Sequence, residues 1–64
     1  MRVCVREGRQ ARLFDGPSTS YVVVGNVDRG EEILVTGRTV IAEDVRMRQL
    51  IDGRWISDRL LCRN

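Results

Sequence analysis

The stretch from Gly16 to Gly25 contains the residue types of a phosphate-binding loop. It reads GPSTSYVVVG, so small and hydroxyl-bearing residues lie between its two glycines. A Walker A loop also needs a lysine after its second glycine to reach the phosphates, and a dinucleotide loop needs the pattern G-x-G-x-x-G. The sequence contains neither that pattern nor any lysine, because all eleven basic residues are arginine. The stretch therefore predicts a turn, in which Pro17 fixes φ and Gly16 permits a backbone that a Cβ would forbid.

Two pairs of adjacent carboxylates, Glu31-Glu32 and Glu43-Asp44, could serve acid–base chemistry or hold a metal ion. Neighbouring residues of a strand point to opposite faces, so neither pair is expected to converge on one point. The chain has no histidine, which removes the usual general base and zinc partner, and its two cysteines are too few for a zinc site. The sequence thus predicts a protein that is not an enzyme, with no catalytic, cofactor or metal site.

Length and composition are those of one small globular domain. The 64 residues are 42% hydrophobic and 31% charged, which argues against disorder. No apolar run approaches the ~20 residues of a membrane span. The N-terminal sequence MRVCVREGRQ lacks the apolar stretch of a signal peptide. We therefore expect a single domain over residues 1–64, in a cytoplasmic or virion-associated protein without membrane insertion.

Short stretches of alternating or β-branched residues, separated by turn residues, predict β-strands along the whole chain. The clearest is RVCVR, which places Val3 and Val5 on one face. Asp52-Gly53 is the strongest short signal for a β-hairpin. No segment has a sustained period of 3.6 residues, so helices are not expected. Strand segments are expected at residues 2–6, 11–14, 21–27, 32–36, 43–50, 54–56 and 60–63, with residues 39–42 as loop or strand.

Short antiparallel strands in so small a chain need closure, because an open sheet leaves its edge strands unpaired. A small, partly open barrel is the economical solution, so the expected fold class is all-β. In the third strand segment, Val22 and Val24 are expected to point inward, with Val27 as a further candidate. The predicted core contains Val5, Leu13, Val24, Ile33, Val35, Val45, Met47, Ile56 and Leu60.

Three stretches resemble the bacterial SH3 (SH3b) family, and the resemblance covers residues 11–61. They are GPSTSY at 16–21, VVGNVDRGEEILV at 23–35 and the pattern G-x-W-I-S at 53–57. The resemblance implies an SH3-like barrel of five to six short antiparallel strands. It also implies a turn at residues 16–18 and a 3₁₀ turn that leads from Ser57 into the last strand.

The SH3-like barrel gives the two cysteines a specific relation. Its first and last strands lie close together, so the resemblance implies that residues 59–63 run near residues 2–6. Cys4 and Cys62 would then come within reach of a disulfide bond. Cytosolic residence favours free thiols instead, and the sequence leaves both alternatives open.

Charge is unevenly distributed, with a net charge of +3 over residues 1–12, −4 over residues 13–45 and +3 over residues 46–64. If the terminal strands meet, the two basic segments join into one side, with Arg63 nearby. Scattered, solvated arginines without a patch are the alternative. For Trp55, packing in the core is the alternative to contact with a ligand. The expected partner-binding residues are Arg46, Arg48, Arg2, Arg6, Tyr21 and Trp55.

These features predict a non-catalytic protein-interaction module that resembles bacterial SH3 domains. Its expected partner is another protein or peptide with an acidic surface, and self-association is a further option. Such a module would be a small subunit of a larger assembly, for example a phage particle. Two alternatives remain: a nucleic-acid-binding SH3-like barrel that uses an arginine-rich face, and a fragment of an exported cell-wall-binding protein.

Overall fold

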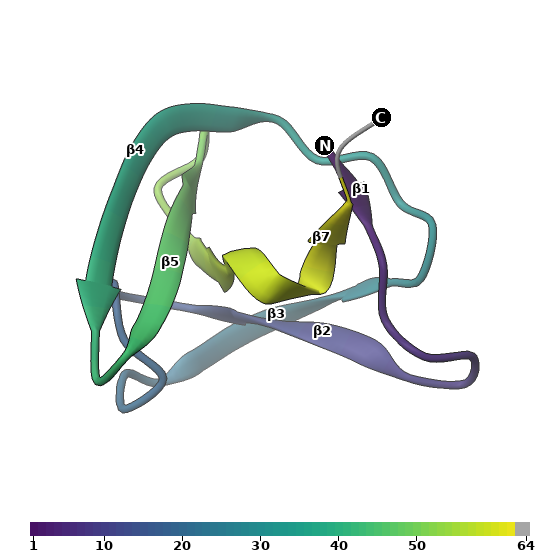
Figure 1. Cartoon of the computed structure of the whole chain (residues 1–64), viewed down its shortest axis with the longest axis horizontal. Helices are drawn as coiled ribbons and strands as arrows, with labels where there is room; N and C mark the ends of the chain where they lie inside the picture. The colour runs from purple at the N-terminus through teal and green to yellow at the C-terminus, as the bar shows by residue number, and fades with distance from the viewer. Residues whose placement is uncertain (63–64) are drawn as a thin grey trace.

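The computed structural model describes residues 1–62 and consists of short strands with one 3₁₀ turn, η1, in that range (Figure 1). The elements follow in the order β1 (Arg2–Val3), β2 (Gln10–Phe14), β3 (Val23–Asp28), β4 (Val35–Ala42), β5 (Val45–Leu50), β6 (Trp55–Ser57), η1 (Asp58–Leu60) and β7 (Leu61–Cys62).

These strands form two antiparallel sheets. The larger sheet has the strand order β3-β2-β6-β5-β4, and the smaller one pairs β1 with β7. In Figure 1 the β4–β5 hairpin runs steeply at the left, and β2 and β3 cross each other in the lower part of the view. The predicted fold class is therefore confirmed: the protein is an all-β, barrel-like domain of short antiparallel strands. Within residues 1–62 no helix is long and apolar enough to cross a membrane.

Two clusters of buried side chains form the core. Of the residues predicted there, Leu13, Ile33, Met47 and Ile56 are buried. Half-buried side chains from the prediction pack against the same clusters, namely Val5, Val35, Val45 and Leu60. The first cluster contains Val3, Ala11, Leu13, Ile33, Leu50 and Ile56, and the second contains Phe14, Met47 and Trp55.

The core prediction for the third strand was wrong by one residue. Val22 and Val24 are 71% and 43% exposed, whereas Val27 packs against the core. The cause is the pairing of β3 with β2, in which the buried Ala11 and Leu13 lie opposite Val27 and Gly25, so these two positions of β3 face inward. Because side chains alternate along a strand, a shift of one residue exposes the whole expected set.

Strand β5 belongs to two hairpins, and the sequence predicted the turn of only one of them. The expected Asp52-Gly53 turn joins β5 to β6, and Gly53 adopts a φ of +92° there. The turn from β4 to β5 was not expected. Glu43 and Asp44 form it with φ values of +53° and +63°, the left-handed pair that a two-residue type I′ hairpin requires. Strand β5 therefore begins at Val45 instead of Glu43.

Strand β4 also differs from the expected segment at residues 32–36. It begins at Val35 and continues through Gly37 to Ala42, so residues 39–42 are strand. Gly37 has a φ of +90°, and the pairing with β5 shifts in register between Val35 and Thr39. An irregularity of this kind lets one strand absorb a glycine that would otherwise end it.

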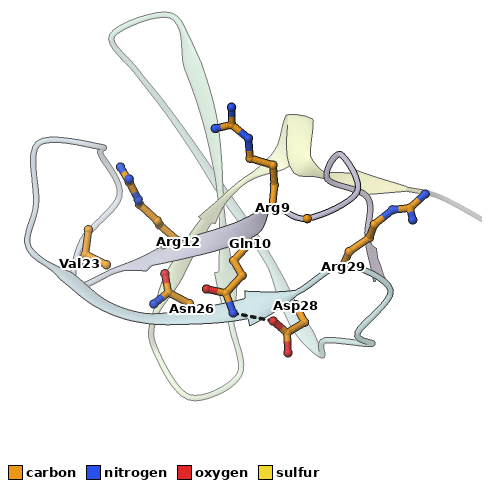
Figure 2. A pocket seen from close by; sticks show the side chains of 8 residues that line it. Arg9, Gln10, Arg12, Val23, Asn26, Asp28 and Arg29 are labelled. Atoms are coloured by element: carbon orange, nitrogen blue, oxygen red, sulfur yellow. Dashed lines mark hydrogen bonds between the residues drawn. The ribbon is translucent and has the colours of Figure 1, made fainter.

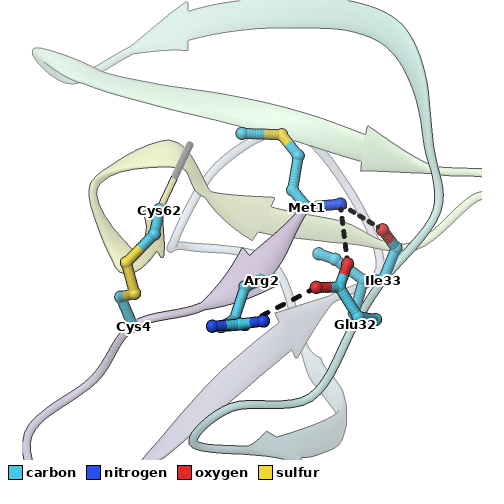
Figure 3. Close-up of polar contacts among 6 residues, drawn as sticks. All are labelled: Met1, Arg2, Cys4, Glu32, Ile33 and Cys62. Atoms are coloured by element: carbon cyan, nitrogen blue, oxygen red, sulfur yellow. Dashed lines mark hydrogen bonds and ion pairs between the residues drawn. A yellow bond between two sulfur atoms is a disulfide. The ribbon is translucent and has the colours of Figure 1, made fainter. Parts of the chain in front are cut away.

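The first and last strands lie side by side, as the SH3-like barrel implied. Val3 lies opposite Leu61, and the N–H of Cys4 donates to the carbonyl oxygen of Leu60 at 2.7 Å. The structure joins Cys4 to Cys62 by a disulfide, with the two Cα atoms 5.5 Å apart (Figure 3).

The N-terminal residue is anchored to the segment before β4. The Met1 ammonium donates to the carbonyl oxygen of Ile33 at 2.8 Å and lies 3.5 Å from the Glu32 carboxylate (Figure 3). The same carboxylate lies 3.6 Å from Nε of Arg2. These contacts hold β1 between β7 and the chain that enters β4, where the N–H of Val3 donates to the carbonyl oxygen of Glu31 at 2.9 Å.

Candidate functional site

Ion pairs divide the arginines into two groups. In residues 1–62, three of them contact carboxylates: Arg2 with Glu32, Arg48 with Asp58, and Arg54 with Asp52. The hydrogen bonds from Arg54 also hold the pKa of Asp52 below its ordinary value of 3.8. A fourth, Arg38, places its guanidinium carbon 5.9 Å from the centroid of the Trp55 ring. These side chains are already engaged within the protein.

Seven exposed arginines have no ion pair to a carboxylate in the part of the chain that the structure describes. Arg38 and Arg46 lie on β4 and β5, and the other five lie around β2 and β3. We call these five the arginine face, which consists of Arg6, Arg9, Arg12, Arg29 and Arg59.

The centre of the arginine face is the hairpin of β2 and β3. In β2 the inward side chains Ala11 and Leu13 are 0% exposed, so the residues between and before them face solvent. The outward residues form two cross-strand pairs, Gln10 opposite Asp28 and Arg12 opposite Asn26. Because side chains alternate along β2, its polar side chains face solvent and its apolar side chains are buried.

Over this hairpin lies an open depression of about 890 Å³ (Figure 2). Arg9 and Arg29 lie at one end of it, because they adjoin the cross-strand pair of Gln10 and Asp28. Its lining is polar apart from glycine and one valine, and consists of Gly8, Arg9, Gln10, Arg12, Val23, Asn26, Asp28 and Arg29.

Two neighbouring hollows connect the remaining arginines to this depression. Arg9 and Gln10 also line a hollow of about 420 Å³ together with Arg6, above the half-buried Val5 and Leu60. Arg9, Gln10 and Arg12 line another, of about 320 Å³, together with Arg59. Since Arg9 and Gln10 belong to all three hollows, the five arginines form one continuous surface.

Three carboxylates accompany these five arginines, and one of them, Glu31, accepts a hydrogen bond from the N–H of Asp28 at 3.2 Å. Asp28 lies on the hairpin itself, where its Oδ1 accepts a hydrogen bond from Nε2 of Gln10 at 2.6 Å (Figure 2). Glu7 lies in the turn between Arg6 and Arg9, which is closed by a hydrogen bond from the N–H of Arg9 to the carbonyl oxygen of Arg6 at 2.9 Å. The arginines outnumber the carboxylates, so the surface remains positively charged.

The structure brings together a different set of arginines from the one expected. Of the expected residues only Arg6 belongs to the arginine face. Arg2 pairs with Glu32, and Arg46 is exposed on β5 opposite Ile41 of β4. The expectation for Arg63 lies outside the described residues.

Arg48 is largely shielded from solvent and is paired within the protein. Its side chain is only 13% exposed, and its Nε donates to Oδ1 of Asp58 at 2.9 Å. The expectation that it faces solvent fails because β5 pairs with β6, which η1 follows directly. Arg48 lies opposite the buried Ile56, and the 3₁₀ turn brings Asp58 to the side of β5 from which Arg48 projects.

Sequence reasoning missed four members of the face, although one had a clear signal. Arg12 lies between the inward residues Ala11 and Leu13, so alternation already assigned it to the surface. Arg29 belongs to the segment expected to be acidic, and only the pairing of β3 with β2 places it beside Arg9.

The two aromatic candidates have different positions. Trp55 is 5% exposed and packs with Phe14 and Met47, so its ring belongs to the core and is not open to a ligand. Tyr21 is 49% exposed in the loop between β2 and β3. Its ring lies directly over Gly16, where any Cβ would collide with it, so the tight turn also positions this tyrosine.

Breaking the Arg48–Asp58 pair is expected to destabilise the protein more than breaking a fully solvated pair. Asp58→Asn should lower the free energy of unfolding by about 1–3 kcal/mol, because the shielded Arg48 guanidinium loses the negative charge that compensates its own. Urea denaturation followed by circular dichroism measures the change. Asp52→Asn is the matched control, since its pair with Arg54 has side chains that are 47% and 40% exposed. This control should cost less than about 1 kcal/mol, and equal losses would contradict the distinction.

Comparisons of the chain with protein-family models, with curated proteins and with solved structures find no match. Residues 1–62 contain no group of three or more histidine, cysteine or carboxylate side chains placed to hold a metal ion. What the arginine face can bind follows from its own geometry: guanidinium groups present paired donors to carboxylate or phosphate oxygens.

Proposed function

We propose that the protein is a small, non-catalytic binding module, an SH3-like barrel of the SH3b type, that binds nucleic acid through its arginine face. The observation that carries this proposal is the gathering of five exposed arginines, free of ion pairs within residues 1–62, around one polar depression. The SH3b assignment draws support from the 3₁₀ turn at Asp58–Leu60, which follows Trp55–Ser57 and leads into the last described strand.

Phosphate is the ligand chemistry that fits this surface best. Arginine binds phosphate oxygens through two parallel N–H donors, and its charge displaces the counterions that surround a nucleic acid. Several arginines spread over one surface can contact several phosphates of one backbone. The carboxylate of Asp28, which repels phosphate, is already bound by Gln10.

The composition of the face favours nucleic acid over an acidic protein. Protein interfaces have an apolar centre with a polar rim, whereas interfaces with nucleic acid are polar and positively charged throughout. Here the centre consists of Arg9, Gln10, Arg12 and Asn26, and Val23 is the one apolar side chain among the residues that line the main depression.

Loss of arginines from the face should weaken binding more than loss of arginines elsewhere. Fluorescence anisotropy with a labelled duplex of about 20 base pairs should give a dissociation constant of about 10⁻⁴–10⁻⁶ M for the wild type at physiological salt, and tighter binding at low salt. Arg9→Gln with Arg29→Gln should weaken binding and reduce the slope of log K against log salt by about two, since each of these arginines accounts for about one phosphate contact.

The matched control is Arg38→Gln with Arg46→Gln, which removes the same charge from β4 and β5, away from the arginine face. It should leave the slope close to that of the wild type. Absence of binding by the wild type at low salt, or an equal effect of both double variants, would refute a role for the face in nucleic-acid binding.

The exposed apolar side chains from Tyr21 to Val24 favour a second candidate function, a protein-interaction module. They are 49%, 71%, 43% and 43% exposed, and they form a continuous run that enters the edge strand β3. Exposed apolar patches mark contacts with other proteins or copies of the same chain. This candidate would make the protein a subunit of a larger assembly, such as a phage particle, with an acidic or identical partner. Sedimentation velocity of the isolated protein tests its self-associating form.

A further inference from the structure

The hairpin at the centre of the arginine face is a two-stranded ribbon over most of its length. Strand β3 pairs with β2 alone in the described chain, and β2 pairs with β6 only at Phe14, opposite Trp55. From Gln10 to Leu13 the ribbon therefore has no third strand on either side within residues 1–62. A two-stranded antiparallel ribbon is narrow enough to enter the major groove of B-form DNA, which is about 12 Å wide.

The outward side chains of this ribbon are of the types that contact base edges. Arg12 lies opposite Asn26, and Gln10 lies opposite Asp28 (Figure 2). Arginine binds O6 and N7 of guanine, asparagine and glutamine bind N6 and N7 of adenine, and aspartate accepts from N4 of cytosine. Arg12 and Asn26 form no side-chain hydrogen bond within the part of the chain that is described, so both are free to bind.

The other arginines of the face lie beside the ribbon, where the phosphates of a bound duplex would pass. Arg9 and Arg29 adjoin its Gln10–Asp28 end, and Arg59 lies next to Arg12 on the side of η1. In protein–DNA complexes, contacts to base edges specify the sequence and contacts to phosphates position the protein. The ribbon carries residue types suited to the first kind of contact, and the arginines at its flanks are suited to the second.

We propose that the β2–β3 ribbon enters the major groove of duplex DNA, with Arg12 and Asn26 at base edges and Arg9, Arg29 and Arg59 at phosphates. The inference rests on the proposed binding of nucleic acid and narrows it to one class. Single strands are bound largely by stacking of bases on aromatic side chains, but Trp55 is buried and the Tyr21 ring lies against Gly16. Double-stranded RNA has a major groove too deep and narrow for side chains to read.

The first test compares three probes of the same sequence by fluorescence anisotropy: duplex DNA, single-stranded DNA and double-stranded RNA. The wild type should bind duplex DNA most tightly. Equal or tighter binding to single strands or to duplex RNA overturns the groove assignment while leaving nucleic-acid binding in place. Failure to bind any of the three refutes the proposed function itself.

The second test removes the atoms that the ribbon would read without changing the charge of the duplex. A DNA duplex with 7-deazaguanine and 7-deazaadenine in place of the purines lacks the N7 acceptors of the major groove. Wild-type binding to it should be weaker by about fivefold or more, because one good bidentate contact accounts for roughly that factor. Equal affinity for the two duplexes overturns entry into the major groove.

Arg12→Lys supplies the matched protein variant, since it keeps the charge but loses the paired donors of guanidinium. It should bind ordinary duplex DNA with nearly the wild-type salt dependence but discriminate less between the ordinary and the deaza duplex. Arg29→Gln should do the opposite, lowering the salt slope by about one and preserving the discrimination. The proposal would also be overturned if Arg12→Lys lowered the salt slope while Arg29→Gln lowered the discrimination between the two duplexes. Both side chains are exposed, and circular dichroism verifies that the variants are folded.

Discussion

Replacing Ile56 by alanine is expected to lower the free energy of unfolding by about 2–5 kcal/mol. Ile56 lies in β6, the middle strand of the larger sheet, and its side chain is 0% exposed. Truncation removes buried apolar surface and leaves a cavity that neighbours on several strands cannot fill. A domain of 64 residues has a total free energy of unfolding of about 3–10 kcal/mol, so this one substitution removes a large part of the stability.

Thermal and urea denaturation followed by far-ultraviolet circular dichroism measure this loss. Ile51→Ala is the matched control, because it deletes the same atoms from a side chain that is 64% exposed. The control should change the free energy of unfolding by about 0.5 kcal/mol or less. If both variants unfold at the same urea concentration, the assignment of β6 to the core is contradicted.

Reduction of the disulfide is expected to lower the free energy of unfolding by about 2–4 kcal/mol. Cys4 and Cys62 are 58 positions apart, so the bridge closes almost the whole described chain into one loop. Closing so long a loop restricts the unfolded chain, an effect worth up to about 4 kcal/mol in the chain-entropy description. A chain this short buries limited surface on folding, so it gains proportionally more from such a link.

Thiol counting in denaturant without reductant tests whether the bond forms, and no reactive thiol is expected. Urea denaturation with and without reductant then measures its contribution. The control is Cys4→Ser with Cys62→Ser, whose stability should match the reduced wild type and should not respond to reductant. Two reactive thiols in the isolated protein would contradict the bridge, and an unchanged urea midpoint on reduction would contradict its stabilising role.

The sequence by itself determined the class of the fold and most of its inward-facing residues. Alternation is a local property of a strand, so the inward positions of Leu13, Met47 and Ile56 could be read directly. The Asp52-Gly53 turn was equally predictable, because its conformational preference lies in the residues themselves. The Glu43-Asp44 turn carried a weaker signal, since aspartate is common at positive φ but glutamate is not, and no glycine is present.

Only the tertiary structure decided which arginines form a surface. The net charge of each segment was visible in the sequence, but the partner of each side chain depends on strand pairing. Pairing of β5 with β6 brings Asp58 onto Arg48 and removes that arginine from the surface. Pairing of β2 with β3 brings Arg29 beside Arg9, from a segment whose overall charge is negative.

The same distinction explains the valines of the third strand and Trp55. A run of valines has no alternation from which to choose an inward face, so the register of β3 against Leu13 decided that Val27 packs against the core and that Val22 and Val24 are exposed. For Trp55, the sequence left the core and the surface as alternatives, and the packing of Phe14 and Met47 around it decided for the core. Periodicity within a strand is set by neighbours along the chain, whereas register and ion pairing depend on residues that only folding brings together.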